Sequence, residues 1–298
     1  MIIAIASGKG GTGKTTVAAS LLSVWDRPVI AVDMDVEEPN LHLFLRPELE
    51  DEIPSNMEVP EVNLNRCNYC GACSEICQFK AISVFNEAIL TFPEMCHGCG
   101  ACFAVCPEDA LTPGARELGA VCRGKAESGK FLMGRLRVGE AMSPPLMRSV
   151  KQYLSEMLSE NSAEQAPDVI IDAPPGVSCP AVNAVMDTDA IVLVTEPTPF
   201  GLYDLKLAVE AFQSMEIPMT VVINRAGLGD SGVHDFCKAR GLSIAAEIPY
   251  DRKIAESYSE GAIIAQSSES LKSLFCDLRD ALCRGDVLTS PAKEVTHG

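Results

Sequence analysis

The chain has 298 residues, of which 47% are hydrophobic and 22% charged, and it carries a formal net charge of −17 and thirteen cysteines. This composition excludes a disordered chain, and the length suits one large α/β domain with or without a small insertion. The negative charge argues against nucleic acid and against an anionic membrane as main partners, because both bind surfaces rich in Lys and Arg.

The N-terminal sequence does not resemble a secretion signal. Its apolar run, residues 1–6, is too short, lacks a basic segment and leads directly into a glycine-rich loop. No run of about 18 apolar residues occurs, so we expect no membrane span. We therefore expect a cytoplasmic protein, in which clustered cysteines bind metal or act in catalysis instead of forming disulfides.

Apolar segments and helical segments alternate along most of the chain. Buried strands are predicted at residues 2–6, 28–34, 169–172, 190–194, 219–223 and 244–248. Helices are expected at about 15–24, 145–160, 201–214, 231–240 and 267–284. This alternation predicts a doubly wound α/β fold with a mostly parallel sheet covered by helices on both faces.

Residues 59–110 interrupt the alternation and contain eight of the thirteen cysteines. We expect them to form an inserted α+β domain between the two parts of the main domain, residues 1–58 and 111–287. Within the second part, residues 111–142 are predicted to return to the main sheet as a hairpin. Residues 288–298 are expected to be a flexible tail.

Residues 8–15, GKGGTGKT, fit the phosphate-binding pattern G-x4-G-K-[ST], with a strand before them and a helix after them. Backbone N–H groups in such a loop surround phosphate oxygens, and the helix N-terminus adds positive potential. Lys14 would reach the β- and γ-phosphates of ATP or ADP, and the Thr15 hydroxyl would bind Mg²⁺. The expected nucleotide-binding residues here are Gly8, Gly10, Gly11, Thr12, Gly13, Lys14, Thr15 and Thr16.

The lysine after the first glycine, Lys9, makes the loop resemble the deviant Walker motif of the MinD/ParA family. That family includes the nitrogenase iron protein and Mrp-type cluster carriers. The resemblance implies that Lys9 crosses a dimer interface to the nucleotide of a partner subunit, which is either a second copy or a similar ATPase chain. Such a lysine would act like an arginine finger. A solvated loop lysine is the alternative.

The resemblance extends to other strand ends. It implies that Asp35 positions or deprotonates the attacking water, that Asp33 lies near Mg²⁺, and that Asp172 holds Mg²⁺ through water. Lys9, Lys14 and Asp35 would then be the catalytic residues. It also assigns four residues to the adenine side, where turn formation is the alternative role: Asn224, Arg225, Pro249 and Asp251.

The inserted segment contains an internal repeat. Residues 67–82 and 96–111 share the spacing C-x2-C-x2-C-x3-C and are identical at seven of sixteen positions. This pattern resembles bacterial ferredoxins with two [4Fe–4S] clusters, in which the fourth cysteine of each run binds the other cluster. The resemblance implies one cluster on Cys67, Cys70, Cys73 and Cys106, and the other on Cys96, Cys99, Cys102 and Cys77.

Zinc and disulfides are the alternatives for these cysteines. Zinc sites use four ligands in pairs separated by a longer spacer, so a duplicated triple C-x2-C run favours iron–sulfur clusters. The chain departs from the ferredoxin pattern at Gln78, where proline is expected after the fourth cysteine. That departure concerns the local turn more than the presence of a cluster.

Cys179 lies seven residues after Asp172, in the segment that the resemblance identifies as switch II. At this offset the nitrogenase iron protein holds a cluster between two subunits. A bridging cluster would need a second cysteine, for which Cys122 is the candidate, but an ordinary thiol is the preferred interpretation because lone cysteines usually pack as small apolar residues.

Together, the two modules predict a dimeric ATPase that couples ATP binding and hydrolysis to electron transfer through two clusters. The electron acceptor would be a redox protein or a metal centre, and the acidic surface suits a basic partner. An ATP-dependent carrier for iron–sulfur or other metal-cluster assembly, resembling Mrp proteins, is the alternative. A partition regulator is least favoured, because the chain is acidic and its last helix lacks the basic face that binds membranes.

Overall fold

The computed structural model describes residues 1–159, 166–252, 254, 256 and 261–291. Within these residues nine strands form one sheet, in the order β11-β10-β9-β1-β8-β2-β7-β6-β3. The seven strands from β11 to β7 run parallel to one another, whereas β6 pairs antiparallel with both β7 and β3. The parallel strands are β1 (Ile2–Ala6), β2 (Val29–Asp33), β7 (Gly129–Leu136), β8 (Asp168–Asp172), β9 (Ala190–Thr195), β10 (Met219–Ala226) and β11 (Ile244–Pro249).

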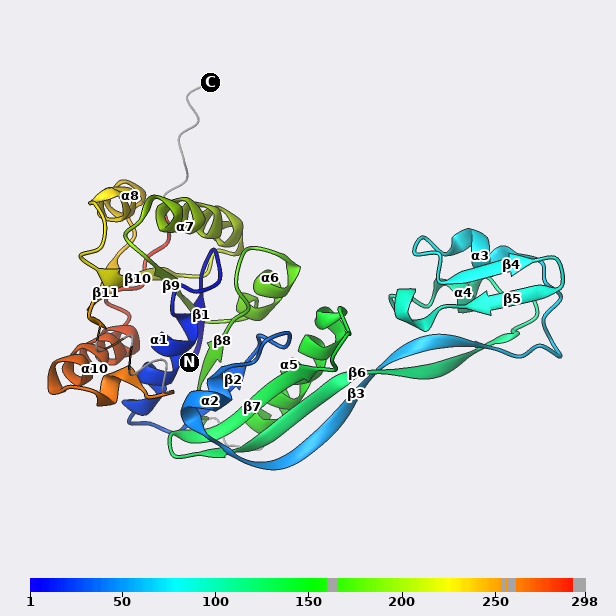
Figure 1. The fold of residues 1–298 in the computed structure, drawn as a ribbon, viewed down its shortest axis with the longest axis horizontal. Coiled ribbons are helices and arrows are strands. Elements are labelled where there is room, and N and C mark those ends of the chain that lie inside the picture. The colour runs from blue at the N-terminus through cyan, green and yellow to red at the C-terminus, as the bar shows by residue number, and fades with distance from the viewer. Residues whose placement is uncertain (160–165, 253, 255, 257–260, 292–298) are drawn as a thin grey trace, which may run out of the picture.

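Helices cover both faces of this sheet (Figure 1). One face carries α1 (Lys14–Ser23), α2 (Leu41–Leu45), the 3-10 turn η4 (Ile264–Gln266) and α10 (Glu269–Arg284). The other face carries α5 (Ser143–Ser159), α6 (Cys179–Val185), α7 (Pro199–Phe212), which leads into η3 (Gln213–Met215), and α8 (Gly232–Arg240). The α/β fold with a mostly parallel sheet is therefore confirmed. Apolar side chains of α10 are buried in the core, so this helix packs on the body as its pattern indicates.

Two long antiparallel strands, β3 (Glu48–Val62) and β6 (Leu111–Ala126), extend from the edge of the sheet as an arm. Near the body, β6 also pairs with β7, from Gly119 to Ala126, which makes the hairpin that returns to the main sheet. On the N-terminal side of Gly119, toward Leu111, β6 pairs with β3 alone, and the two strands project away from the body (Figure 1). Pro54 and Pro60 are tolerated because β3 is an edge strand.

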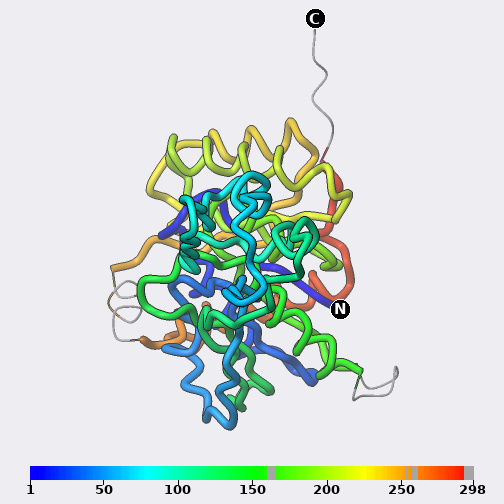
Figure 2. The backbone as a smooth tube through the Cα atoms, turned by 90° about the vertical axis from the view of Figure 1, so that its right-hand side faces the viewer, coloured from blue at the N-terminus to red at the C-terminus, as the bar shows by residue number. Residues whose placement is uncertain are grey.

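The arm carries a small lobe, residues 63–110, at its far end (Figure 1). Seen along the arm in Figure 2, the lobe lies in front of the main body. The boundary expected at residue 59 falls inside β3, which continues to Val62. The lobe contains α3 (Ala72–Ile76), β4 (Ile82–Phe85), β5 (Ala88–Thr91), η1 (Pro93–Met95) and α4 (Ala101–Ala104).

The apolar core of the lobe is very small. Cys73, Ile82 and Leu111 are its buried members, and Cys102 and Cys106 are among the partly buried residues packed against them. Cysteine side chains therefore make up much of this core. A lobe of this size buries too little apolar surface to be stable by packing alone, which makes a covalent or metal cross-link the expected source of its stability.

The stretch expected to be a tail begins with an ordered contact. Thr289 forms an antiparallel bridge with Met219, with N···O distances of 2.7 and 3.0 Å, so the start of this stretch lies against β10. Residues 292–298 of the predicted tail lie outside the described residues. In the part of the chain that the structure describes, no helix is both long and apolar enough to cross a bilayer.

Candidate functional site

The phosphate-binding loop lies between β1 and α1, at the carboxyl edge of the parallel strands. Gly11 and Gly13 have positive φ angles of 78° and 95°, a conformation that glycine adopts without a steric cost. Gly13 caps α1, and the Lys14 side chain that follows it is only 7% exposed. The backbone amides of the first turn of α1 and the Lys14 ammonium are thus available to one anion.

The turn after β8 contacts this loop directly. Gly176 N donates to Ser7 O at 3.0 Å, and Ala173 N donates to Ile5 O at 3.0 Å. An added Cβ on Gly10 would lie 3.9 Å from Pro175. The segment identified as switch II therefore lies beside the phosphate loop, where it can respond to a γ-phosphate.

Three aspartates, Asp33, Asp35 and Asp172, lie close to one another and to the phosphate-binding loop. Asp33 is fully buried, and its two oxygens accept N–H groups of Asp35 at 3.1 Å and Leu41 at 2.9 Å, which shapes the loop after β2. Asp172 is 1% exposed; its side chain is hydrogen-bonded to Thr15, and its Oδ1 has no hydrogen-bond partner. An orphaned carboxylate oxygen beside a threonine hydroxyl is a donor set that suits Mg²⁺.

Burial raises the pKa of all three carboxyls. The pKa of Asp172 rises to about 6, although Lys14 and the Thr15 hydroxyl oppose the shift. The pKa of Asp35 also rises to about 6 through burial, again opposed by Lys14. Burial and the charge of Asp172 raise the pKa of Asp33. Burial thus disfavours the charged form of these carboxyls, and a bound divalent cation would offset this cost.

In metal-free protein, Asp172→Asn is expected to increase the free energy of unfolding at pH 7.5 by about 1–3 kcal/mol. A carboxyl whose folded pKa is raised destabilises the fold above that pKa, and the penalty fades as pH falls through about 6. Urea unfolding in EDTA, followed by the fluorescence of the single tryptophan, Trp25, measures this at pH 7.5 and pH 5. A variant less stable than the wild type at pH 7.5 would contradict the expected cost of this buried charge.

Lys9 lies on the outer side of the phosphate loop. Its Nζ is 3.8 Å from Asp204 Oδ2 on α7, and its side chain is 33% exposed. The same part of α7 packs closely on the loop, because an added Cβ on Gly8 would lie 2.0 Å from Asp204 O. Asp204, which the sequence analysis did not single out, thus holds Lys9 at the surface of the monomer. Because Lys9 and Asp204 are far apart in the sequence, only the folded structure reveals this contact.

The residues assigned to the adenine side lie at the ends of β10 and β11. Asn224 Nδ2 donates to Thr12 O at 2.8 Å, and Gly13 has no room for a Cβ beside this side chain. Arg225 forms an ion pair of 2.8 Å with Glu196, and Pro249 pairs with Ala226. Asn224 therefore contacts the phosphate loop, and Asn224, Arg225, Pro249 and Asp251 all stay predicted adenine-side residues.

Comparison with known proteins identifies the family. Residues 3–264 match the model of the CobQ/CobB/MinD/ParA nucleotide binding domain. The chain belongs to this family. Protein MJ0578 of Methanocaldococcus jannaschii is 30% identical over 289 residues, covering 94% of this chain and 97% of the relative. An iron-sulfur cluster carrier protein of Aquifex aeolicus is 28% identical over 139 residues, covering 42% of this chain and 37% of the relative.

The fold of the family is also recovered by structural comparison. The septum site-determining protein MinD of Pyrococcus horikoshii, complexed with Mg-ADP, superposes with a TM-score of 0.57 at 19% identity, covering 96% of both chains. This MinD/ParA-family chain is accordingly a nucleotide-binding ATPase. The roles of individual residues stay predictions.

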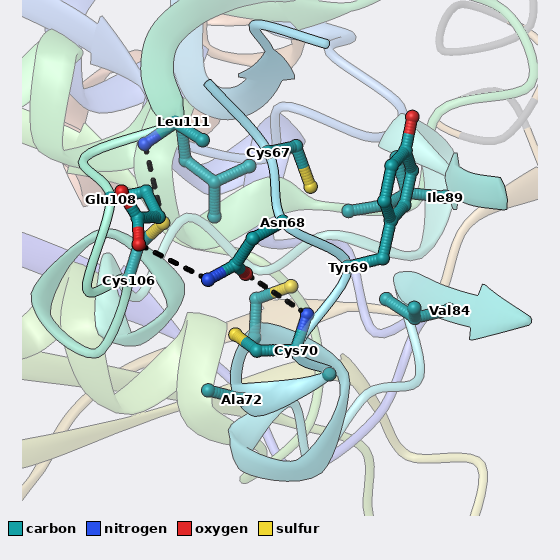
Figure 3. Close-up of a pocket in the computed structure, with 13 residues that line it drawn as sticks. Cys67, Asn68, Tyr69, Cys70, Ala72, Val84, Ile89, Cys106, Glu108 and Leu111 are labelled. Carbon is teal, nitrogen blue, oxygen red and sulfur yellow. Dashed lines mark hydrogen bonds between the residues drawn. The ribbon is translucent and has the colours of Figure 1, made fainter. Parts of the chain in front are cut away.

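The small lobe brings the cysteines of its two repeats into two pockets. A small pocket is lined by the first cysteine set, Cys67, Cys70, Cys73 and Cys106. Figure 3 shows the thiols of Cys67, Cys70 and Cys106 around this pocket. Asn68 closes one side, because its amide accepts from Cys70 N and donates to Glu108, both at 3.1 Å. Three cysteines of one motif and one of the other thus share a pocket.

A second small pocket is lined by the second cysteine set, Cys77, Cys96, Cys99 and Cys102. The two halves of the lobe repeat the same local geometry. Ala81 N donates to Cys77 Sγ at 3.3 Å, and Ala110 N donates to Cys106 Sγ at 3.2 Å. Gly71 and Gly100, with φ angles of 84° and 73°, begin α3 and α4 in the same way. Gln78, which stands where the ferredoxin pattern has proline, does not disturb this symmetry.

Neither set is arranged around a single ion. Within the described residues, no group of three or more His, Cys, Asp or Glu side chains could hold one metal ion. Each cysteine of a cubane binds a different iron, so its four sulfurs lie further apart than those around one zinc ion. Four thiols line each pocket, which is the number of ligands that a [4Fe–4S] cluster takes.

The structure does not bring Cys122 and Cys179 together. Cys122 is fully buried on β6, in the core on the α1 side of the sheet. Cys179 is exposed at the first residue of α6, whose helix packs on the opposite face. A cluster held by both is therefore not supported, and Cys179 is an exposed thiol in the segment identified as switch II.

Proposed function

We propose that this ATPase couples ATP binding and hydrolysis to electron transfer through two [4Fe–4S] clusters in the small lobe. The observation that carries the proposal is the composition of the two pockets. Each is lined by three cysteines of one motif and the last cysteine of the other, as in bacterial two-cluster ferredoxins. The clusters would accept and donate single electrons.

The lobe offers further support in its packing. Its apolar core is so small that two clusters would supply most of its folding energy. The N–H groups of Ala81 and Ala110 donate to cysteine sulfurs, and such hydrogen bonds help to set cluster potential. Residues 63–110 would thus be a ferredoxin-like domain.

In the nucleotide site, Lys14 would neutralise the β- and γ-phosphates, while Thr15 and Asp172 would hold Mg²⁺. Asp33 would shape the loop that presents Asp35, and Asp35, whose pKa is raised by burial to about 6, would orient the attacking water or accept its proton. Lys9 would leave Asp204 and reach the nucleotide of the partner subunit, a second copy or a similar chain.

Coupling is tested by redox titration of the two clusters, followed by EPR, with ADP or a non-hydrolysable ATP analogue. We expect the ATP analogue to shift the potential of at least one cluster, because ATP reorders the loops beside Asp35 and Gly176. Identical titrations in both nucleotide states, together with unchanged dimerisation, would contradict coupling.

A second candidate is an ATP-dependent carrier for iron–sulfur or other metal clusters. It is favoured by the similarity to a relative named as an iron-sulfur cluster carrier protein. The same protein preparation separates the two functions. Transfer of iron and sulfide to an acceptor apo-protein would support the carrier, whereas reduction of an acceptor with full retention of iron would support electron transfer.

A further inference from the structure

A series of contacts joins the loop after β2 to the end of β7. Val36, which follows the predicted catalytic residue Asp35, accepts a hydrogen bond at its carbonyl from Leu136 N, at 2.9 Å. The Val36 side chain also packs on Gly134, where an added Cβ would lie 2.5 Å from its Cγ1. A displacement of the Asp35 loop would therefore act on the last residues of β7.

The bridging loop, residues 137–142, follows β7 and is fixed to the arm. Arg137 N donates to Leu118 O at 2.8 Å. Glu140 Oε1 accepts from Arg116 at 2.7 Å and from the N–H groups of Ala141 and Met142. The Arg116 and Glu140 side chains are only 6% and 8% exposed. This buried ion pair and its additional hydrogen bonds favour a single arrangement of the bridging loop against the arm, because separating the two charges would leave both unpaired.

Arg116 continues the series into the second cysteine motif. Its Nη1 donates to Pro93 O, and the same oxygen accepts Cys96 N at 3.0 Å. Cys96 also packs against the cluster of apolar side chains at the base of the lobe, together with Leu136 and Met142. A cysteine of the second set therefore shares a hydrogen-bond acceptor with the buried pair.

The two cysteine sets differ in their contacts with the arm. The pocket of the second set includes Glu58 and Pro60 of the arm, and Gly98 packs on Met57. The pocket of the first set is lined by lobe residues and by Leu111 at the base of β6. The second set is thus the one that contacts the arm on the side joined to the nucleotide site.

The bridging loop also leads directly into α5, which touches both nucleotide-sensing segments. Ser143 and Met147 line a cleft with Asp35, Pro175 and Ser178. The start of α5 therefore faces the loop after β2 and the turn after β8 across this cleft. Movement of either segment could therefore also displace the bridging loop through the start of α5.

We propose that Arg116, Glu140 and the bridging loop are positioning residues that make the second cysteine set, and not the first, respond to the nucleotide. This inference rests on the proposed function, in which both sets hold clusters. Movement of the Asp35 loop would shift the bridging loop, Pro93 and the Cys96 backbone in turn. The exposure and hydrogen bonds of the second cluster would change, and both affect its potential.

Hydrogen exchange of backbone amides tests this on the cluster-loaded protein. We expect the ATP analogue to change exchange rates in residues 93–99 by about fivefold or more, the lower end of typical allosteric coupling, relative to ADP. Residues 67–73, around the first set, are expected to exchange at the same rate in both states. An equal response of the two segments, or no response in residues 93–99, would overturn the inference.

Glu140→Gln keeps the shape of the side chain and removes the charge that holds Arg116. The nucleotide response of residues 93–99 and of the second cluster's potential should be lost in this variant. The matched control is Glu52→Gln, which breaks an exposed pair of the same 2.7 Å length between Glu52 of β3 and Arg135 of β7, and which should leave the response intact. A full response in Glu140→Gln would contradict the proposal.

Two measurements separate this inference from the proposed function. Iron content and Trp25 fluorescence report whether Glu140→Gln folds and is loaded. If it is not, Met142→Ala tests the same route, because Met142 of the bridging loop packs against the apolar cluster that Cys96 also contacts. Protein that lacks iron would refute the proposed function itself. Loaded protein in which the first cluster alone shifts with nucleotide would refute only the route through Arg116 and the bridging loop.

Discussion

Lys9→Ala is expected to lower the rate of ATP hydrolysis by about 10³-fold while leaving nucleotide binding nearly unchanged. Lys9 is not buried as Lys14 is; it lies at the surface, held near Asp204. Its charge would therefore act on the nucleotide of a partner subunit. A cation supplied only on association contributes to the transition state and little to binding by the isolated subunit.

Steady-state hydrolysis and equilibrium binding of a fluorescent ATP analogue measure the two effects separately. Lys206→Ala, a change of an exposed lysine on the same helix as Asp204, is the matched control and should hydrolyse ATP normally. Lys14→Ala should instead lose nucleotide binding, because its ammonium is buried beside the phosphate site. Normal hydrolysis in Lys9→Ala would contradict a role across a dimer interface.

Cys70→Ser is expected to remove one cluster and to lower the iron content by about half. Cys70 is exposed, so its replacement removes a ligand with little loss of packing. Cys99 is its counterpart in the second motif and is also exposed, so Cys99→Ser should remove the other cluster. Iron analysis and EPR of the reduced proteins would measure both, with Cys283→Ser as a control thiol far along the chain.

The crossed arrangement makes a sharper prediction. Cys106→Ser should give the EPR spectrum of Cys70→Ser, because both line the first pocket, and Cys77→Ser should give that of Cys99→Ser. If each motif held its own cluster, Cys77→Ser would instead resemble Cys70→Ser. The grouping of the four spectra thus decides between crossed and separate ligand sets.

The features that the sequence predicted well are those that depend on short, local patterns. The glycine loop, the strand ends at Asp33 and Asp172, and the alternation of strands and helices all follow from periodicity and spacing. The two cysteine sets follow from the resemblance of the repeated cysteine spacing to that of two-cluster ferredoxins, and the lobe places their members in two pockets.

The features that the sequence did not predict depend on contacts between distant segments. Residues 48–62 form a long strand although they are acidic and contain two prolines, because an edge strand pairs on one side only. The buried pair of Arg116 and Glu140, and the approach of Asp204 to Lys9, join residues far apart in the chain. No local pattern marks such residues before the fold is known.

The measurement that tests the account most directly is the iron and acid-labile sulfide content of anaerobically purified wild-type protein, together with its EPR spectrum after reduction. The account predicts about eight iron and about eight sulfide per chain, with the spectrum of two neighbouring [4Fe–4S] clusters. Zinc in place of iron, or cysteines that react as free thiols in the purified protein, would contradict it.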